Sequence, residues 1–390
     1  MGGESREREL RVAVVSPEPT PYRAPLFDRV AARPELDLTV IYAARTVAER
    51  TWVVEPRHRA VFLRGVNVPG AARVLAHDYP VTPGIWSSLG AARPDCVIVS
   101  GWSTFAAQAA VVWCRLRRVP FLLLVESHDA RPRAGWRRAL TAAVVPAIVG
   151  RSAGALVTGT LARRSLVARG ALPGRVRVFA NTIDVEEWGE RADRLAARRP
   201  ELRQALGLGP DDVAALCVAR LSPEKGHQTL VRAVAATGDA RAVLVLAGDG
   251  PERARLERLA RELGVRCLFA GDVPHDRVVE AYCAADLFVL LSERETWGVV
   301  VNEAAACGLP LVLSDRVGAA FDLLREGENG FIVPAGDVAA TARALRRLVE
   351  DRDSRLAAGA RSRELVRGWG YGPSVDNLVA AVEEAVAPGR

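Results

Sequence analysis

The feature that most constrains the fold is a regular alternation of short apolar runs with helix-like segments. The apolar runs of the first half are LRVAVVSPEP (10–19), LDLTVIYAA (36–44), DCVIVSG (95–101), FLLLVES (121–127), ALVTGT (155–160) and VRVFANTID (176–184). Those of the second half are DVAALCVARL (212–221), RAVLVLAGDG (241–250), VRCLFAGDV (265–273), DLFVLLS (286–292), LPLVLSD (309–315) and NGFIVP (329–334). Strands that alternate with helices indicate parallel sheets covered on both faces.

The alternation restarts near residue 212, so we expect two doubly wound, Rossmann-like α/β domains facing across a cleft. The predicted bounds are 1–188 for the first domain and 189–370 for the second. A final amphipathic helix, within 371–390, is expected to pack back on the first domain. The charged stretch EEWGERADRLAARRP (186–200) marks the boundary. In such folds ligands bind at the carboxyl ends of the strands.

The charge is unevenly distributed along the chain. Residues 1–185 hold 26 arginines against 14 acidic residues, although the whole chain carries a formal charge of only +7. A basic half favours an anionic partner such as a phosphate-bearing acceptor, an acidic membrane surface or nucleic acid. General arginine richness is the simpler explanation, because the chain has 52 arginines and a single lysine, Lys225.

The cysteines and histidines give little support for a disulfide framework or a metal site. The six cysteines show no CxxC spacing, and the five histidines show no HxxxH spacing. The one DxD sequence, Asp351-Arg352-Asp353, lies in a charged helix-end segment and is interpreted as a solvated face. We therefore expect no metal and no cofactor.

Two glutamates stand eight residues apart in ETWGVVVNE (295–303). If the whole stretch were helical, the spacing would separate Glu295 from Glu303 by roughly 12 Å along the axis. The paired carboxylates of glycosidases lie about 5–9.5 Å apart, so this pair is poorly suited to one reacting bond. It is better suited to binding two ends of a long ligand, with a phosphate at the helix start between them. Two solvated glutamates on a buried helix are the alternative.

Cationic side chains follow the first apolar run of the second half, in ARLSPEKGHQTL (219–230). Arg220 and Lys225 lie within six residues and could neutralise a diphosphate. Lys225 supplies a compact ammonium in a chain that otherwise uses arginine.

Taken in order, ARLSPEKG, LAGDGPE, FAGDV, ETWGVVVNEAAACGLPLVLSD and ENGFIVPAGD resemble the C-terminal signature of retaining glycosyltransferase family 4. That family has the GT-B fold and uses nucleotide-diphosphate sugars, and the resemblance covers roughly residues 212–340. PTPYRAPLF (19–27), SGW (100–102) and VESHD (125–129) resemble polysaccharide-building members more loosely. A glycine-rich loop that is common after the first strand in this family is replaced here by SPEPTPYR.

The resemblance implies roles for individual residues. Arg220 and Lys225 would hold the diphosphate, Glu295 would lie by the donor sugar, and Glu303 would bind the ribose. Further donor-binding positions implied are Thr296, Trp297, Gly298, Val299, Gly248 and Val273. His128 and Glu126 are rival candidates for a first-half catalytic residue, and Tyr22 and Arg23 are expected on the acceptor side.

The implied function is metal-independent, retaining transfer of a sugar from a nucleotide-diphosphate sugar to an acceptor hydroxyl. It would serve polysaccharide, glycolipid or other glycoconjugate biosynthesis. The acceptor would be a carbohydrate, a lipid-linked molecule or a small molecule. A GT-B nucleotide-sugar epimerase or phosphorylase and a basic nucleic-acid-binding protein are the alternatives. The last lacks any recognised reading module, so no nucleic-acid partner is expected.

A cytoplasmic location is expected, because no apolar run reaches the roughly 18 residues of a membrane span. The segment 129–150, DARPRAGWRRALTAAVVPAIVG, places four arginines and a tryptophan before an apolar helix. It has two interpretations: a core-packing helix with a charged start, or peripheral contact with the anionic inner face of a membrane.

Overall fold

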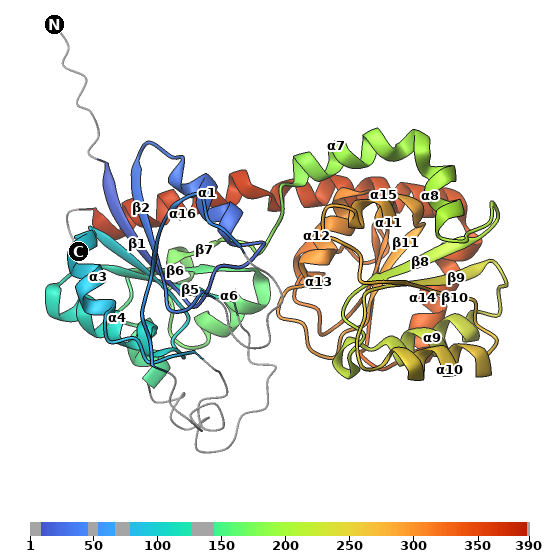
Figure 1. Cartoon of the computed structure of the whole chain (residues 1–390), viewed down its shortest axis with the longest axis horizontal. Helices are drawn as coiled ribbons and strands as arrows, with labels where there is room; N and C mark the ends of the chain where they lie inside the picture. Colours follow the sequence, from blue (N-terminus) through green and yellow to red (C-terminus); the bar gives the residue numbers. More distant parts are fainter. Residues whose placement is uncertain (1–8, 46–53, 67–78, 127–143, 388–390) are drawn as a thin grey trace, which may run out of the picture. The chain divides into compact units, whose positions relative to one another are not determined.

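The computed structural model describes residues 9–45, 54–66, 79–126 and 144–387 (Figure 1). The chain divides into two compact units. The first comprises residues 1–181 and 371–390, and the second comprises residues 182–370.

The first unit is built on a seven-stranded parallel sheet. Its strands are β1 (Leu10–Ser16), β2 (Leu36–Tyr42), β3 (Arg59–Phe62), β4 (Cys96–Ser100), β5 (Phe121–Val125), β6 (Gly154–Val157) and β7 (Val176–Val178). The order across the sheet is β3-β2-β1-β4-β5-β6-β7. The strand order reverses between β1 and β4, which are hydrogen-bonded neighbours. Of these strands, β3 is the one that the apolar pattern missed, because RAVF is too short and too polar on one side to stand out.

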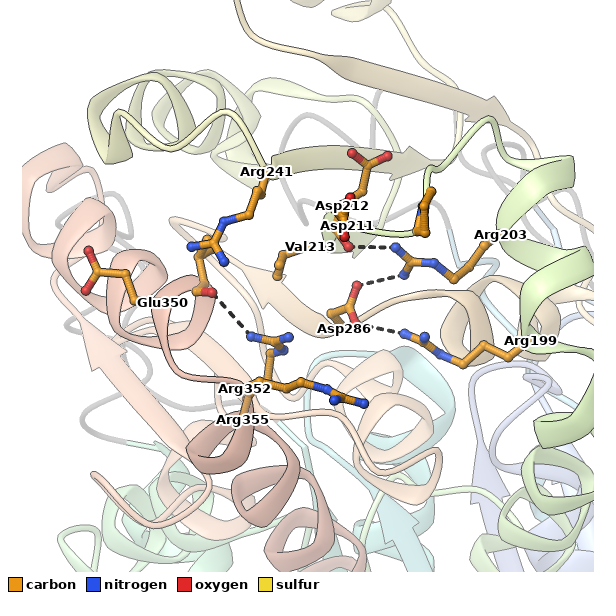
Figure 2. A pocket seen from close by; sticks show the side chains of 12 residues that line it. Arg199, Arg203, Asp211, Asp212, Val213, Arg241, Asp286, Glu350, Arg352 and Arg355 are labelled. Carbon is orange, nitrogen blue, oxygen red and sulfur yellow. Dashed lines mark hydrogen bonds and ion pairs between the residues drawn. The ribbon is translucent and has the colours of Figure 1, made fainter.

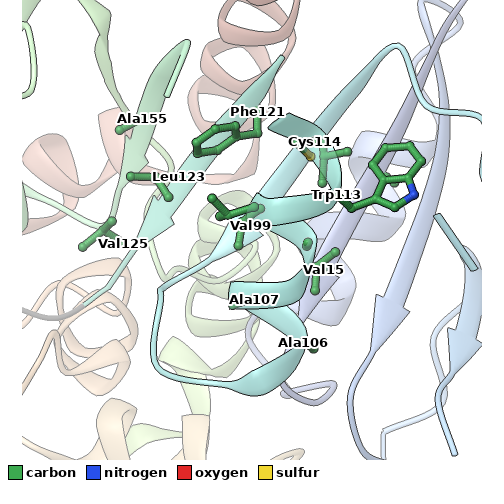
Figure 3. Close-up of a cluster of buried hydrophobic side chains, with 14 of the residues drawn as sticks. Val15, Val99, Ala106, Ala107, Trp113, Cys114, Phe121, Leu123, Val125 and Ala155 are labelled. Carbon is green, nitrogen blue, oxygen red and sulfur yellow. The ribbon is translucent and has the colours of Figure 1, made fainter. Parts of the chain in front are cut away.

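Helices cover both faces of this sheet. They are α1 (Ala24–Ala31), α3 (Ile85–Ala92), α4 (Phe105–Arg117), α6 (Thr160–Val167) and α16 (Tyr371–Val386). Successive strand residues point to opposite faces, so Val14 packs with α1 and α16, whereas Val15 packs with α3 and α4. Figure 3 shows the second of these cores, in which Trp113 and Cys114 of α4 lie by Val15.

The second unit contains a six-stranded parallel sheet. Its strands are β8 (Val213–Val218), β9 (Ala242–Ala247), β10 (Cys267–Gly271), β11 (Leu287–Leu290), β12 (Leu311–Ser314) and β13 (Gly330–Val333). The order is β10-β9-β8-β11-β12-β13, so the direction of the winding reverses between β8 and β11. The expected fold class, two Rossmann-like α/β domains, is confirmed.

Two helices of the second unit precede its first strand, and the others come after strands. The helices are α7 (Val185–Leu195), α8 (Arg199–Ala205), α9 (His227–Thr237), α10 (Arg253–Glu262), α11 (Val278–Ala284), α12 (Val299–Ala306), α13 (Ala320–Leu323), α14 (Val338–Glu350) and α15 (Arg352–Val366). The predicted boundary at residue 188 falls inside α7, whereas the units separate between Asn181 and Thr182. The charged stretch is helical because Asp184 caps α7 and Trp188 is buried, so charge there marks a solvated helix face rather than a linker.

Candidate nucleotide-sugar site

The loops after β8 and β11 meet at the switch point of the second sheet. Open α/β sheets bind ligands at this place, outside the carboxyl ends of the strands. The backbones of the two loops touch, because the N–H of Glu293 donates to the carbonyl of Glu224 at 2.8 Å. This contact brings the sequence motifs 219–226 and 291–298 to one edge of the sheet.

Two glycines allow this close approach. Gly226 has φ 71°, and a Cβ placed there would lie 2.2 Å from the carbonyl oxygen of Leu291. Gly248, which follows β9, has φ 138°, and its Cβ would lie 2.1 Å from the carbonyl oxygen of Ala219. Both positions therefore need glycine for space as well as for conformation.

The single lysine of the chain bridges the two loops. Lys225 Nζ donates to Glu295 Oε2 at 2.5 Å, and the side chains are 22% and 19% exposed. Arg220 lies on the same loop as Lys225 and is exposed, and no acidic side chain of the described residues forms an ion pair with it. The edge thus holds one cation that a nearby carboxylate already binds and one that faces solvent.

The start of α12 lies beside this pair. Gly298 precedes α12 in the left-handed conformation, with φ 94°, and no side chain caps the helix. Thr296, Gly298 and Val299 are half-buried, so the first turn of α12 is accessible in part. The helix begins only at Val299, so residues 295–298 form a loop and the estimate for a continuous helix does not apply to Glu295. A helix start of this kind favours an anion.

The side chain of Trp297 points into the protein. It is 2% exposed, its Nε1 donates to Asn302 Oδ1 at 2.9 Å, and its ring lies 5.3 Å from that of Trp369. Asn302 in turn donates to Thr182 Oγ1 at 3.2 Å. Because its indole is engaged in this way, Trp297 can offer a ligand only its backbone N–H.

The buried hydrogen bonds from Trp297 to Asn302 and from Asn302 to Thr182 were not predicted from the sequence. Asn302 interrupts the apolar run VVVNEAAA, and that interruption was the available signal. Its partner Thr182 is 120 positions away in the sequence. Trp369, which contacts Trp297 and Thr182, is also remote, so no local pattern links these residues.

Glu303 is almost wholly buried on α12. Tyr282 of α11 donates its hydroxyl to Glu303 Oε2 at 2.8 Å, and the carboxyl-bearing residue is 6% exposed. Burial raises the pKa of Glu303 to about 7, although the hydrogen bond from Tyr282 opposes this rise. The same burial raises the pKa of Tyr282 well above its usual value. Glu303 is therefore held ready as an acceptor, but it is only partly ionised near neutral pH.

The remaining donor-side predictions fall on the same edge of the sheet. Gly248 follows β9, and its N–H donates to the carbonyl of Gly271 at 2.7 Å. Val273, two residues after β10, is half-buried. His227 begins α9 next to Lys225, and burial lowers its pKa to about 4, with the charge of Lys225 adding to the effect. His227 is thus neutral near pH 7.

In the first unit, Arg23 joins three distant segments. Its side chain is 4% exposed, and Nη2 donates to Glu126 Oε1 at 2.9 Å and to Asn181 Oδ1. The guanidinium also lies 4.8 Å from the ring centroid of Phe179. Arg23 therefore positions Glu126 at the end of β5, rather than presenting its own charge to a ligand.

The other first-unit candidates are placed less fully. Glu126 is 39% exposed at its side chain, and Tyr22 is half-buried. His128 lies outside the described residues, as do the four arginines of the 129–150 segment. The described end of that segment is helical, and Val145 and Val149 pack into the core of Figure 3.

The DxD sequence has a structural explanation. Asp351 caps α15, because its side chain accepts from the N–H of Ser354 at 2.9 Å, and Asp353 is exposed. Among the residues that the structure describes, no group of three or more His, Cys, Asp or Glu side chains is arranged to hold a metal ion. No helix within those residues has the length and apolar character needed to cross a membrane.

Comparison with known families places the second unit. Residues 198–365 match the family described as glycosyl transferases group 1. This range contains all the second-unit residues of the candidate site except Thr182 and Trp369.

Curated relatives agree with this match. The D-inositol 3-phosphate glycosyltransferase of Thermomonospora curvata is 35% identical over 237 residues, which are 57% of this chain and 54% of the relative. The sulfoquinovosyl transferase of Arabidopsis thaliana is 29% identical over 295 residues, which are 73% and 55% of the two chains. The chain thus spans about half the length of the curated relatives it matches. These relatives give no support to the epimerase alternative.

Solved structures extend the fold comparison to both units. HepE of Anabaena, in complex with UDP, matches with a TM-score of 0.72 at 18% identity, over 95% of this chain and 98% of its own. A glycosyltransferase of Rickettsia africae matches with a TM-score of 0.75 at 11% identity, over 98% and 100%. At such identities the likeness concerns the fold alone. The match of residues 198–365 to the glycosyl transferases group 1 family covers less than half of the chain, so the family likeness concerns the second unit.

Proposed function

We propose that this protein is a glycosyltransferase that moves a sugar from a nucleotide-diphosphate sugar to an acceptor hydroxyl. The observation that carries the proposal is the Lys225–Glu295 pair at the β8/β11 switch point, inside the group 1 domain. A diphosphate near Lys225 would compete with Glu295 for the ammonium. Glu295 would then be free to accept from the hydroxyls of the donor sugar.

The donor is assigned to the carboxyl edge of the second sheet. Arg220 and Lys225 would bind the diphosphate, with the N–H groups at the start of α12 as further donors. Glu303 would accept from the ribose hydroxyls in exchange for part of its contact with Tyr282. Two observations support this: the relatives are named as transferases of sugars, and HepE was solved with UDP.

The chemistry proposed is transfer with retention and without a metal. The acceptor hydroxyl would attack the anomeric carbon from the face that the diphosphate leaves. A phosphate oxygen would accept the hydroxyl proton, while Arg220 and Lys225 would stabilise the negative charge that develops. Preorganised charge of this kind is commonly the largest single contribution to catalysis. No resident cofactor takes part in this scheme.

The first unit is assigned to the acceptor. Glu126, held by Arg23, is the described candidate for a catalytic contact there, and Tyr22 is the candidate for acceptor binding. The proposed transferase would act in the synthesis of a polysaccharide, glycolipid or other glycoconjugate, in the cytoplasm or at the cytoplasmic face of the membrane. For a lipid-linked acceptor, peripheral contact with anionic lipid is part of the proposal.

The decisive test is the release of nucleoside diphosphate by the purified chain across a panel of UDP-, GDP-, ADP- and TDP-sugars, with chelator present. We expect slow hydrolysis of one donor, lost in Glu303→Gln, a variant that keeps the size of the buried side chain. Glu293→Gln, an exposed change near the site, is the matched control. Failure to bind any donor by calorimetry would refute the proposal, and activity that needs added metal would refute the metal-independent scheme.

A further inference from the structure

A cavity lies at the opposite, amino edge of the second sheet. Its volume is about 320 Å³, within the lower range of about 300–1,000 Å³ for small-molecule sites. The first residue of β8 and the residues just before β9 and β11 form one side of it. Charged side chains from these strand starts, from α8 and from the α14–α15 junction line the cavity. They include Arg199, Arg203, Asp286, Arg241, Arg352 and Arg355.

Five arginines surround this cavity, and two of them are fixed by one carboxylate. Arg199 and Arg203 of α8 each donate to Asp286 at 2.8 Å, and Asp286 also accepts from the N–H of Ala214. Figure 2 shows both guanidinium groups turned toward Asp286 from the same side. Asp286 is therefore occupied by three donors and has little capacity to neutralise other arginines.

The nearby acids are largely engaged elsewhere. Asp212 accepts at 2.8 Å from Arg266, which does not line the cavity. Arg241 forms an ion pair at 2.7 Å with Asp239. The last two acids of the lining, Asp211 and Glu350, are exposed. No described carboxylate of the lining is therefore both buried from solvent and without a cationic partner.

Positive charge is left over on α15. Arg355 is 8% exposed, and its Nη1 donates to the carbonyl oxygens of Leu348 and Val349, which are neutral acceptors. Arg352 is exposed, and no described acidic side chain forms an ion pair with it. Burial lowers the pKa of Arg355, and the nearby charge of Asp286 raises it. The positive charges of Arg352, Arg199 and Arg241 lower it further. The surroundings of Arg355 thus carry an excess of positive charge.

We propose that this cavity is a second binding site, which takes a small phosphate-bearing anion between Arg352 and Arg355 of α15 and Arg199 of α8. Arg203 has a structural role, because its Nη1 and Nη2 already donate to Asp286 and to the carbonyls of Ala284, Gly209 and Asp212. Planar guanidinium groups bind phosphate oxygens in pairs, and a partly buried site strengthens such bonds. The site lies at the amino ends of the strands, whereas the proposed donor site lies at their carboxyl ends. The anion would tie α15 to α8 and stabilise the second unit.

The test measures binding by calorimetry on the full chain at constant ionic strength, with inorganic phosphate, pyrophosphate and glucose 6-phosphate as probes. We expect saturable binding and a raised Tm with at least one probe, and binding weakened about tenfold or more in Arg352→Gln. Arg343→Gln, which removes an exposed arginine of α14 outside the cavity, should bind as the unaltered chain does. Arg220→Gln, on the opposite edge, should also retain binding.

Three results would overturn the proposal: no saturable binding in the millimolar range, equal weakening in Arg352→Gln and Arg343→Gln, or loss of binding in Arg220→Gln alone. The last would place the phosphate at the carboxyl edge. If the sugar phosphate binds more tightly than inorganic phosphate, the ligand is a phosphorylated sugar, and if not, it is free phosphate. An unfolding curve of Arg352→Gln without ligand shows that the variant is folded, so a loss of binding can be attributed to the missing guanidinium.

Discussion

The two units have the same winding pattern but build the carboxyl edges of their sheets in different ways. In the second unit, the backbones of neighbouring loops touch through Gly226 and Gly248, and one short ion pair, Lys225–Glu295, bridges them. In the first unit, a buried arginine, Arg23, reaches Glu126 and Asn181 across 103 and 158 positions of sequence.

This difference explains why the residues at the carboxyl edge of the second sheet could be predicted from the sequence. The contacts at the carboxyl edge of the first sheet could not. Backbone contacts demand glycine at fixed offsets from a strand, so they leave a local pattern. A long-range ion pair demands only that two residues meet after folding, so it leaves none. The predictions below test whether the second edge is the catalytic one and whether the first is mainly held by its ion pair.

The largest effect is expected on turnover from Lys225→Ala. If Lys225 stabilises the leaving diphosphate, its loss lowers the rate about 10²–10³-fold, and Arg220→Ala falls in the same range. Nucleoside diphosphate release measures it once the donor is known. Arg294→Ala, an exposed change on the neighbouring loop, is the control, and equal losses in all three would show that only general charge matters.

The next effect concerns pH and Glu303. Its pKa is about 7 in the folded chain, above the ordinary value of 4.5. Between about pH 4.5 and 7 the folded chain keeps a proton that the unfolded chain has released, so the free energy of unfolding falls as pH rises through this window. The fall attributable to Glu303 is at most about 3 kcal/mol. Urea unfolding at pH 5 and pH 8 should show a smaller fall in Glu303→Gln.

A result in which wild type and Glu303→Gln change equally with pH would show that Glu303 is already ionised at pH 5. Glu293→Gln is the control, because this exposed residue should leave the pH dependence as it is. The pH dependence of the free energy of unfolding must be compared between wild type and Glu303→Gln, because other groups also titrate in this range. His227, for example, has a pKa lowered to about 4 and acts in the opposite direction.

Two glycines with the same conformation separate backbone strain from steric overlap. Gly226 and Gly238 have φ 71° and 69°, but a Cβ at Gly238 meets nothing within 4 Å. Gly238→Ala should cost about 1–2 kcal/mol for the left-handed conformation. Gly226→Ala should cost about 1–3 kcal/mol more, because the methyl group overlaps Leu291. Equal costs in urea unfolding would mean that the two loops move apart easily.

The smallest effect is expected at the first edge. Glu126→Gln keeps an oxygen that accepts from Arg23, and the side chain is 39% exposed, so the loss of stability should be about 1 kcal/mol. Glu35→Gln, which alters an ion pair with Arg33 in the same unit, should change it by less than about 0.5 kcal/mol. Loss of turnover in a folded Glu126→Gln would support the catalytic contact proposed for Glu126, and unchanged turnover would refute it.

Much of the fold and part of the site could be predicted from the sequence. Every apolar run assigned as a strand overlaps one, and the alternation correctly predicted two parallel sheets. The resemblance assigned Lys225 and Glu295 to two parts of one donor, and the structure places Lys225 Nζ 2.5 Å from Glu295 Oε2. The short strand β3 was missed, because RAVF has no distinctive local pattern. The predicted boundary at residue 188 lies inside α7, whereas the two compact units divide between Asn181 and Thr182.

By itself, the sequence determined the class of fold and the edge at which the motifs gather, because hydrophobic periodicity and glycine placement act over a few residues. Only the tertiary structure decided that Trp297 points inward to Asn302, that Tyr282 holds a buried Glu303, and that Arg23 anchors Glu126. These contacts join residues on different elements. Burial and hydrogen bonding between such residues arise only when the packed chain removes them from water.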